Sequence, residues 1–257
     1  MWPQPLQLGP IGFNLYGLLV AFGALAGLFL LRRTAPKVGI SPRAAGDLGF
    51  WLIVAGLLGA RLFYVLFHLR EFAAKPLKVF FYWQGGLMFQ GAVLVAAATA
   101  FFLLKKRKQS FWPMADAVAP ALALGQSIGR LGCYAAGCCF GRPAHHGPLT
   151  VVFPPGSAAP SGFPLYPTQL MEAFSLMAIA IFLGARLSKK PAPGRVFALY
   201  ALLAGGLRAL LEQFRGDFRG APIGGQAPTF WLALGLMAFG VWGLIRYSPR
   251  TPLNFVH

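Results

Sequence analysis

Apolar residues gather into seven runs along the chain, each close to the length that a helix needs to cross a membrane, about 20 residues. The runs cover 11–31, 48–68, 86–104, 111–129, 168–187, 195–213 and 227–246. Backbone polar groups in lipid must be satisfied within the protein, and these runs are too long for barrel strands. The pattern therefore predicts an all-α integral membrane protein with seven transmembrane helices, folded as a single domain over residues 1–257.

Composition supports a membrane protein, because 57% of the residues are hydrophobic and only 11% are charged. A water-soluble fold is excluded by this balance. The formal net charge is +17, but the basic residues do not form a stripe with interleaved aromatic residues. Nucleic acid is therefore not an expected partner.

The distribution of lysine and arginine predicts the topology. Fourteen of the 23 basic residues follow the first, third, fifth and seventh runs, so they lie on one side if seven helices alternate. The positive-inside rule places that side in the cytoplasm. We expect a multi-pass protein of the bacterial cytoplasmic (inner) membrane, with its N-terminus outside and its C-terminus inside. The fourteen are Arg32, Arg33, Lys37, Arg43, Lys105, Lys106, Arg107, Lys108, Arg186, Lys189, Lys190, Arg195, Arg246 and Arg250.

The remaining nine basic residues lie within the runs or on the outer side, where the topology rule does not require them. They predict an anionic ligand. Asp116, Glu172 and Glu212 lie inside or at the ends of runs, where ionisable groups are costly and usually functional. The nine are Arg61, Arg70, Lys75, Lys78, Arg130, Arg142, Arg208, Arg215 and Arg219.

Two of these arginines have alternative interpretations from spacing alone. Arg208 and Glu212 are four residues apart, so they share a helix face and can pair as a structural clasp or as part of a substrate site. Arg61 follows Gly59 and Ala60, where small residues permit close helix packing. A structural arginine and a ligand-binding arginine are both consistent with that position.

The longest irregular stretch runs over 130–167 and is rich in glycine and proline. It contains Arg130, Arg142 and all three cysteines, Cys133, Cys138 and Cys139. Long irregular connections in compact proteins are usually functional or disordered. The charged and thiol side chains favour function for this outer-side region.

The chain resembles the bacterial prolipoprotein diacylglyceryl transferases over nearly its whole length, because short motifs recur in the family's order. These are Tyr16-Gly17, Gly59 to Tyr64, Gly85 to Gly91, Ala115 to Pro120, Gly129 to Gly132, Gly141-Arg142, Tyr166 to Glu172, Arg208 to Glu212, Phe214-Arg215 and Gly225-Gln226.

The resemblance implies transfer of the diacylglyceryl group of phosphatidylglycerol to the thiol of a lipobox cysteine in a prolipoprotein signal peptide. Membrane lipid and that peptide are the implied partners, and neither a cofactor nor a metal is expected. Arginine suits the leaving phosphate because its planar fork binds phosphate oxygens bidentately and stays charged. The implied catalytic residues are Arg130, Arg208, Glu212 and Tyr16; the implied substrate-binding residues are Arg142, Arg215, Gln90, Cys133, Gly141, Gln169, Glu172 and Arg61.

This chain departs from the family pattern at two places. Gln90 stands where the family carries histidine, a leading candidate for deprotonating the thiol, and glutamine cannot act as a base at neutral pH. The family's asparagines are replaced at Cys133 and Ala136, and an acidic residue is replaced at Cys138. The segment from Gly129 to Arg142 therefore keeps the family's flanking glycines and arginines, while the polar side chains between them are changed.

The cysteines have several possible roles. Cys133 could form a disulfide with Cys138 or Cys139 if the loop folds back, or the thiols could simply pack. With His145 and His146 they supply soft or borderline ligands, but the spacing lacks a CxxC pair, so a metal is the less favoured interpretation. A cysteine nucleophile between arginines is conceivable, although a thioether formed on it would be a dead end.

Three hypotheses follow from the sequence. In the first, the chain is a working diacylglyceryl transferase in which Tyr16 or an arginine-bound water replaces the missing histidine. In the second, the same phospholipid site serves a different acceptor. In the third, the chain is a non-catalytic lipid-binding or redox-sensing membrane protein, which the retained Arg130, Arg208 and Glu212 argue against.

Overall fold

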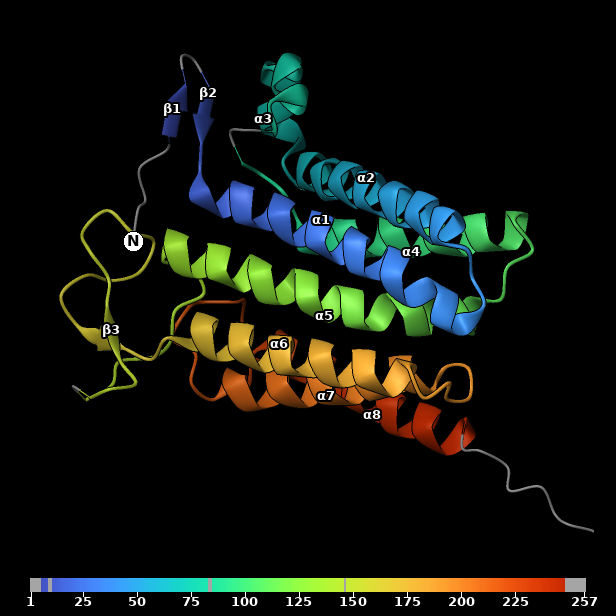
Figure 1. The fold of residues 1–257 in the computed structure, drawn as a ribbon. Helices are drawn as coiled ribbons and strands as arrows, with labels where there is room; N and C mark the ends of the chain where they lie inside the picture. The colour runs from blue at the N-terminus through green and yellow to red at the C-terminus, as the bar shows by residue number, and fades with distance from the viewer. Residues whose placement is uncertain (1–5, 9–10, 83–84, 146, 248–257) are drawn as a thin grey trace, which may run out of the picture.

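The computed structural model describes residues 6–8, 11–82, 85–145 and 147–247. Each apolar run of the sequence forms a long helix in this part of the chain (Figure 1). His146 and Arg250, two residues used in the sequence analysis, lie outside the described residues. The helices are α1 (Leu15–Thr34), α2 (Pro42–Phe67), α4 (Phe89–Lys106), α5 (Phe111–Ala136), α6 (Thr168–Leu187), α7 (Arg195–Glu212) and α8 (Pro228–Arg246).

Short elements occur between the long helices and correct the expectation of purely helical structure. The strands β1 (Leu6–Leu8) and β2 (Ile11–Phe13) pair antiparallel, and so do β3 (Val151–Val152) and β4 (Pro164–Leu165). A short helix α3 (Leu69–Ala74) and the 3-10 turns η1 (Ala35–Val38) and η2 (Pro76–Phe80) complete the connections. The first helix begins later than predicted because residues 11–13 form a strand.

The second helix begins earlier than the apolar pattern indicated. Its N-cap is Ser41, whose hydroxyl accepts a hydrogen bond from the backbone N–H of Ala44 at 3.2 Å, and proline occupies the first helical position. Both features favour helix initiation at Pro42. The predicted start at residue 48 was wrong. Hydropathy identifies only the apolar part of a helix, and the first turns of α2 contain the charged residues Arg43 and Asp47.

Helix α5 lies between α1 and α6 in the array (Figure 1) and packs closely on both. Small residues permit this approach: a Cβ added to Gly23 of α1 would lie 2.8 Å from the carbonyl oxygen of Gly125. Alanines at 117, 119 and 123 of α5 are completely buried. Helix packing in membranes relies on such small side chains because burial from lipid gives little hydrophobic gain.

The connections divide between two ends of the helix array. In Figure 1 the α1–α2, α4–α5 and α6–α7 connections lie at the same end as the C-terminal end of α8. The opposite end carries the β1–β2 hairpin, α3 and the irregular region that follows α5. The predicted basic connections are therefore gathered at one end, although no membrane is present to orient them.

Five described helices are long and apolar enough to cross a membrane: α1 with η1, α2, α4, α6 and α8. The chain is therefore a mostly helical, multi-pass membrane protein, and crossing by α5 and α7 remains a prediction. Helix α7 carries three charged residues, Arg195, Arg208 and Glu212, and α5 carries Asp116 and Arg130. The two less apolar helices thus supply charged residues to the interior of the array.

Candidate active site

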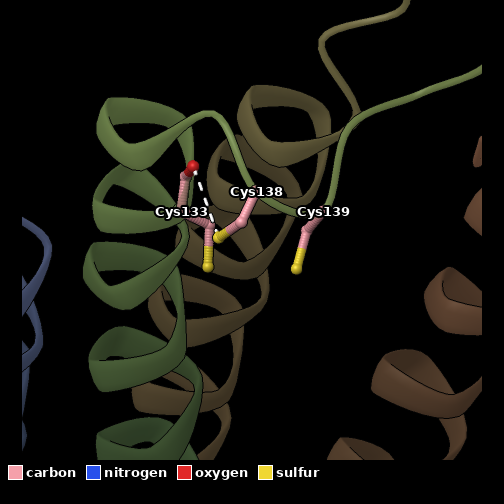
Figure 2. Close-up of side chains that lie close together, drawn as sticks. All are labelled: Cys133, Cys138 and Cys139. Carbon is pink, nitrogen blue, oxygen red and sulfur yellow. Dashed lines mark hydrogen bonds between the residues drawn. The ribbon is translucent and has the colours of Figure 1, made fainter. Parts of the chain in front are cut away.

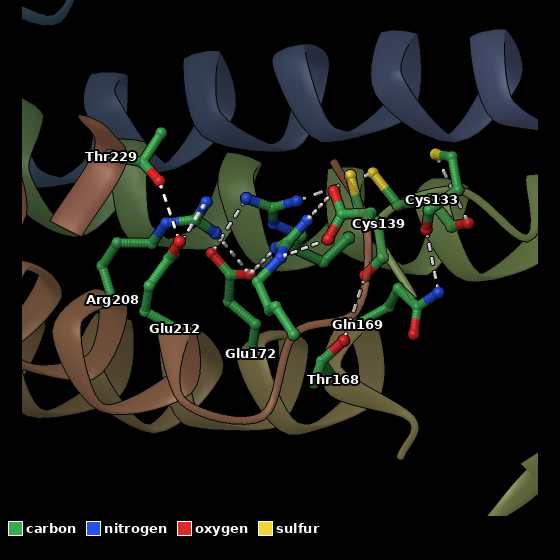
Figure 3. A network of polar contacts seen from close by, with 12 residues as sticks. Cys133, Cys139, Thr168, Gln169, Glu172, Arg208, Glu212 and Thr229 are labelled. Carbon is green, nitrogen blue, oxygen red and sulfur yellow. Dashed lines mark hydrogen bonds and ion pairs between the residues drawn. The ribbon is translucent and has the colours of Figure 1, made fainter. Parts of the chain in front are cut away.

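Arginine and carboxylate side chains from four segments meet where α5 and α7 end and α6 begins (Figure 3). We call this set the arginine cluster. Helix α5 contributes Arg130, α6 contributes Glu172, and α7 contributes Arg208 and Glu212, while the segment after α7 contributes the rest. Its members are Arg130, Glu172, Arg208, Glu212, Arg215, Asp217 and Arg219.

Glu172 is the centre of the arginine cluster. Its carboxylate lies 2.9 Å from a guanidinium nitrogen of Arg130 and 3.6 Å from nitrogens of both Arg208 and Arg215. Glu172 is only 7% exposed, so water screens these ion pairs weakly. Removing one partner of such a buried network leaves uncompensated charge, which is strongly destabilising.

Glu212 orients the opposite side of Arg208. Its carboxylate lies 3.6 Å from Arg208, also pairs with Arg219, and accepts a hydrogen bond from the Thr229 hydroxyl at 3.1 Å. Thr229 belongs to α8, so Glu212 joins that helix to α7. The arrangement contains the clasp that the spacing of Arg208 and Glu212 offered as one alternative, and a substrate role for Arg208 stays a prediction.

Arg215 is held by Asp217 through two hydrogen bonds, at 2.9 and 3.0 Å. Burial disfavours the charged guanidinium, but the hydrogen bonds and charge of Asp217 outweigh this effect and raise the pKa of Arg215 above its ordinary value. Arg215 is therefore a permanent cation in the cluster. A fixed cation is what the binding of a phosphate group requires.

The arginine cluster has more positive than negative charge, since four arginines face three carboxylates. Within the described residues, one guanidinium nitrogen of Arg208, the Nη1 atom, is buried without a hydrogen-bond acceptor, as is Nε of Arg219. Buried polar groups are normally hydrogen-bonded. Both nitrogens are nevertheless ion-paired, Nη1 of Arg208 with Glu172 at 3.6 Å and Nε of Arg219 with Asp217 at 3.5 Å. The surplus positive charge of the cluster is therefore the feature that favours an anionic ligand.

The three cysteines lie beside the arginine cluster. Figure 2 shows Cys133 on the last turn of α5 and Cys138 and Cys139 on the segment that follows it. Their sulfur atoms all lie within 4.8 Å of one another, and the three thiols are free. Arg130 connects the two groups, because a second guanidinium nitrogen lies 3.9 Å from the Cys133 sulfur.

A tight backbone crossing at Gly141 positions these residues. Its N–H donates to the carbonyl of Tyr166 at 3.1 Å, and the neighbouring N–H of Arg142 donates to the carbonyl of Phe214 at 2.8 Å. A Cβ added to Gly141 would lie 2.4 Å from the Tyr166 oxygen, so no larger residue fits. Gly141, which the resemblance implied as a substrate-binding residue, has a positional role in the structure, because it joins the ends of α5 and α7 to the start of α6.

Other residues predicted for the site lie around its edge. Tyr16 is 44% exposed, and its ring borders Gly132, where an added Cβ would approach it to 3.4 Å. The side-chain amide of Gln169 donates to the carbonyl of Cys138 at 2.8 Å. Arg142 is exposed, with its guanidinium 5.7 Å from the centre of the Phe214 ring.

Arg61 and Gln90 lie outside the contacts of the arginine cluster. Arg61 is 4% exposed and donates to backbone carbonyls of the connection between α2 and α4, including Val79 at 3.0 Å and Gly85 at 2.6 Å. These contacts fit a structural role and give no support to substrate binding. Gln90 is exposed on the first turn of α4, and the described polar contacts of the cluster do not include it.

Asp116 also has a structural position. Its carboxylate accepts hydrogen bonds from the backbone N–H groups of Gly194 at 2.7 Å and Phe197 at 2.8 Å. These groups belong to the start of α7, where backbone donors have no partner within the helix. Asp116 therefore caps α7 from a neighbouring helix.

The sequence did not identify Asp217 and Thr229 as site residues, and it assigned Arg219 only to the outer basic group. Asp217 and Arg219 follow Arg215 at spacings of two, and each has the chemistry needed to pair with its neighbours. The local alternation of charge was a usable signal. Thr229 had no such signal in the sequence, because its contact with Glu212 arises only when α8 packs beside the end of α7.

Comparison with known proteins agrees with this geometry. The prolipoprotein diacylglyceryl transferase family matches residues 3–246. The chain is 33% identical to the phosphatidylglycerol–prolipoprotein diacylglyceryl transferase of Clostridium tetani (strain Massachusetts / E88), covering 86% of this chain and 88% of the relative. It is also 33% identical to the protein of that name from Gloeobacter violaceus (strain ATCC 29082 / PCC 7421), covering 96% and 95%. The chain belongs to the prolipoprotein diacylglyceryl transferase family.

Proposed function

We propose that this protein transfers the diacylglyceryl group of phosphatidylglycerol to a prolipoprotein, as the names of its relatives indicate for those proteins, and that the acceptor group is a cysteine thiol. The observation that carries the proposal is the arginine cluster, which combines surplus positive charge with a buried Arg208 nitrogen that makes no hydrogen bond and is only ion-paired with Glu172 at 3.6 Å. Phosphatidylglycerol carries one negative charge on its phosphate. That charge would balance the surplus positive charge of the cluster, and the phosphate oxygens would accept a hydrogen bond from Arg208.

The cluster supports the reaction through its leaving group. The acceptor sulfur attacks the glycerol carbon of the diacylglyceryl group, a C–S bond forms, and the C–O bond to the phosphate breaks with its electron pair leaving on oxygen. Charge on the departing glycerol phosphate then grows beside Arg130 and Arg208. Preorganised donors aimed at developing charge lower the barrier because they do not have to reorient during the reaction.

The topology supports the same function. We infer that α5 and α7 cross the membrane together with the five apolar helices, giving seven spans with the N-terminus outside the cytoplasmic membrane. The basic connections then lie in the cytoplasm, and the arginine cluster lies at the opposite, outer end of the array (Figure 1). A secreted prolipoprotein anchored by its signal peptide would present its lipobox cysteine at that end.

A second candidate is a phospholipid-dependent transferase with a different acceptor. Two observations favour keeping it: Gln90 cannot act as a base and lies outside the contacts of the cluster, and cysteines replace the polar lining of the signature. This candidate shares the phosphate site with the first and differs in the group that receives the diacylglyceryl unit. Binding or redox sensing without catalysis is less consistent with the cost of burying Glu172 and Glu212 among partly buried arginines.

The decisive experiment is a transfer assay with purified protein in detergent, phosphatidylglycerol and a lipobox peptide, followed by peptide mass. We expect the peptide to gain one diacylglyceryl group. Arg208→Ala should slow the reaction by about 100-fold or more, as loss of a preorganised donor does elsewhere. Arg43→Ala is the matched control, because Arg43 is exposed at the other end of the array, and it should retain the activity of the unaltered protein.

Three results would decide between the candidates. A mass gain that depends on Arg208 supports lipobox transfer. Release of glycerol phosphate without a change in the peptide points to a different acceptor. Equal rates in Arg208→Ala and Arg43→Ala would remove the arginine cluster from the reaction.

A further inference from the structure

The cysteine trio, Cys133, Cys138 and Cys139, has no role in the phosphate chemistry of the arginine cluster. Figure 2 shows the three side chains on the same side of the turn that ends α5. Among the described residues, they form the one group of histidine, cysteine and acidic side chains whose ligand atoms lie close enough to share a metal ion. Their sulfur atoms lie within 4.8 Å of one another.

Neighbouring backbone contacts fix this geometry. The Thr168 hydroxyl donates to the carbonyl of Cys139 at 3.0 Å, and the Gln169 amide donates to the carbonyl of Cys138 at 2.8 Å. Cys139 has a φ of 62°, in the left-handed region that residues other than glycine seldom adopt. The first turn of α6 therefore holds the cysteine segment in a conformation it would not favour alone, which is common at functional sites.

Three thiolates without a fourth protein ligand match a particular kind of zinc site. Structural zinc sites have four protein ligands, whereas catalytic zinc sites have three and keep one position open. With Zn–S distances of about 2.3 Å, sulfur atoms around a tetrahedral ion lie about 3.8 Å apart, within the spacing that the trio allows. A disulfide, by contrast, would use two of these thiols and leave the third without a role.

We propose that Cys133, Cys138 and Cys139 bind a zinc ion whose open position takes the acceptor thiol. This inference rests on the proposed transferase function and supplies the group that this chain lacks at Gln90. Coordination to zinc deprotonates a thiol without a protein base. The zinc site lies beside the phosphate site, because Arg130 contacts both Cys133 and Glu172.

The step balances without a redox partner. The acceptor thiol displaces water from zinc and releases its proton to solvent. Its sulfur then attacks the glycerol carbon, the C–O bond breaks, and glycerol phosphate leaves with the electron pair. The product is a neutral thioether, a weaker ligand than a thiolate because it carries no charge, so the lipidated peptide leaves and the open position is restored.

Charge supports the arrangement. Three thiolates and Zn²⁺ carry one net negative charge, and the acceptor thiolate adds another. Arg130 lies next to Cys133 and remains a cation, so it stabilises the loaded site. The same guanidinium contacts Glu172, so one arginine joins the cysteine trio to the arginine cluster.

The first test measures metal directly. The full chain, purified in detergent under reducing conditions, is dialysed against Zn²⁺ and its metal content is determined by mass spectrometry. We expect stoichiometric zinc in the unaltered protein and in His145→Ala, a matched control because His145 is exposed on the same loop and outside the trio. Cys133→Ser should lose it. Zinc retained by Cys133→Ser, or no stoichiometric zinc in the unaltered protein, would overturn the site.

The second test follows the open position. With Co²⁺ in place of Zn²⁺, thiolate coordination gives a charge-transfer absorption that is independent of turnover. A lipobox peptide should increase this absorption, and the same peptide with serine in place of cysteine should not. Equal responses to both peptides, or none to either, would contradict binding of the acceptor thiol.

Activity separates this inference from the proposed function. Removing zinc with a chelator should slow lipobox transfer by about 100-fold, the scale of a lost acid–base contribution, and added Zn²⁺ should restore it. Full transfer by metal-free protein would overturn the zinc proposal and leave the transferase function intact. A cobalt response to the peptide with no transfer from phosphatidylglycerol would support acceptor binding at the metal and contradict diacylglyceryl transfer.

Discussion

At the scale of single residues, Glu172 controls the charge of the site, because it shares its carboxylate among Arg130, Arg208 and Arg215. Glu172→Gln keeps the shape and removes the charge. We expect a loss of about 3 kcal/mol in stability, the scale of a broken buried ion pair. We also expect phosphatidylglycerol to restore more of the thermal midpoint in this variant than in the unaltered protein, since its phosphate supplies the missing negative charge.

Thermal unfolding in detergent, with and without phosphatidylglycerol, measures both effects. Diacylglycerol, which has the same chains without a phosphate, is the lipid control. Glu71→Gln is the control variant, because Glu71 lies on the surface in a 3.5 Å pair with Lys78, and exposed pairs contribute little. Equal stabilisation by the two lipids in Glu172→Gln would exclude phosphate binding next to Glu172.

The sequence singled out residues whose chemistry is unusual in their surroundings. Glu172 and Glu212 were singled out because charge in an apolar run is costly, and Arg130 and Arg208 because the positive-inside rule does not explain them. The structure places all four together. Arg61 satisfied the same criterion and lies elsewhere, among backbone carbonyls. Cost of burial identifies a residue that needs partners, but it does not say whether those partners are ligands or the chain itself.

At the scale of elements, the start of α7 depends on Asp116. Its carboxylate accepts two backbone hydrogen bonds there, from Gly194 and Phe197, and the helix then leads to Arg208. Loss of a capping side chain costs about 1 to 2 kcal/mol. We expect Asp116→Ala to lower the stability of the protein by that amount in thermal unfolding, with Asp116→Asn intermediate because its amide oxygen keeps one acceptor.

Asp47→Ala is the control for this prediction, since Asp47 is exposed on α2. It should leave the thermal midpoint unchanged. If Asp116→Ala unfolds at the same temperature as the control, the capping bonds contribute nothing to the fold. The comparison also tests α7 as the support of Arg208, because fraying of its start should lower transfer activity less than Arg208→Ala does.

Element positions were predictable where hydropathy and local chemistry coincide. The predicted bounds 168–187 match those of α6, where proline precedes the helix and a basic residue ends it. The bounds of α1 and α2 differ because strand pairing over 11–13 and the Ser41 cap act on the backbone and leave no apolar signature. Short hairpins inside Gly/Pro-rich connections are equally invisible to a search for membrane-length runs.

At the scale of the whole molecule, the separation of basic connections from the arginine cluster predicts which compartment each end faces. Reporters fused after residue 108 and after residue 149 test this, because the first position follows α4 and the second follows α5. Green fluorescent protein fluoresces when its fusion point is cytoplasmic, and alkaline phosphatase is active only outside. We expect fluorescence without phosphatase activity at 108, and phosphatase activity without fluorescence at 149.

The two positions differ by one helix, α5, whose polar residues keep it out of the set of five apolar spans. Opposite reporter results would show that α5 crosses the membrane despite Asp116 and Arg130, whose charges are satisfied by the start of α7 and by Glu172 of α6. The same results would place Cys133, Cys138 and Cys139 in the outer compartment, where a bound metal would protect them from oxidation. Identical results at the two positions would mean that α5 does not cross, and both the cluster and the cysteines would then face the cytoplasm.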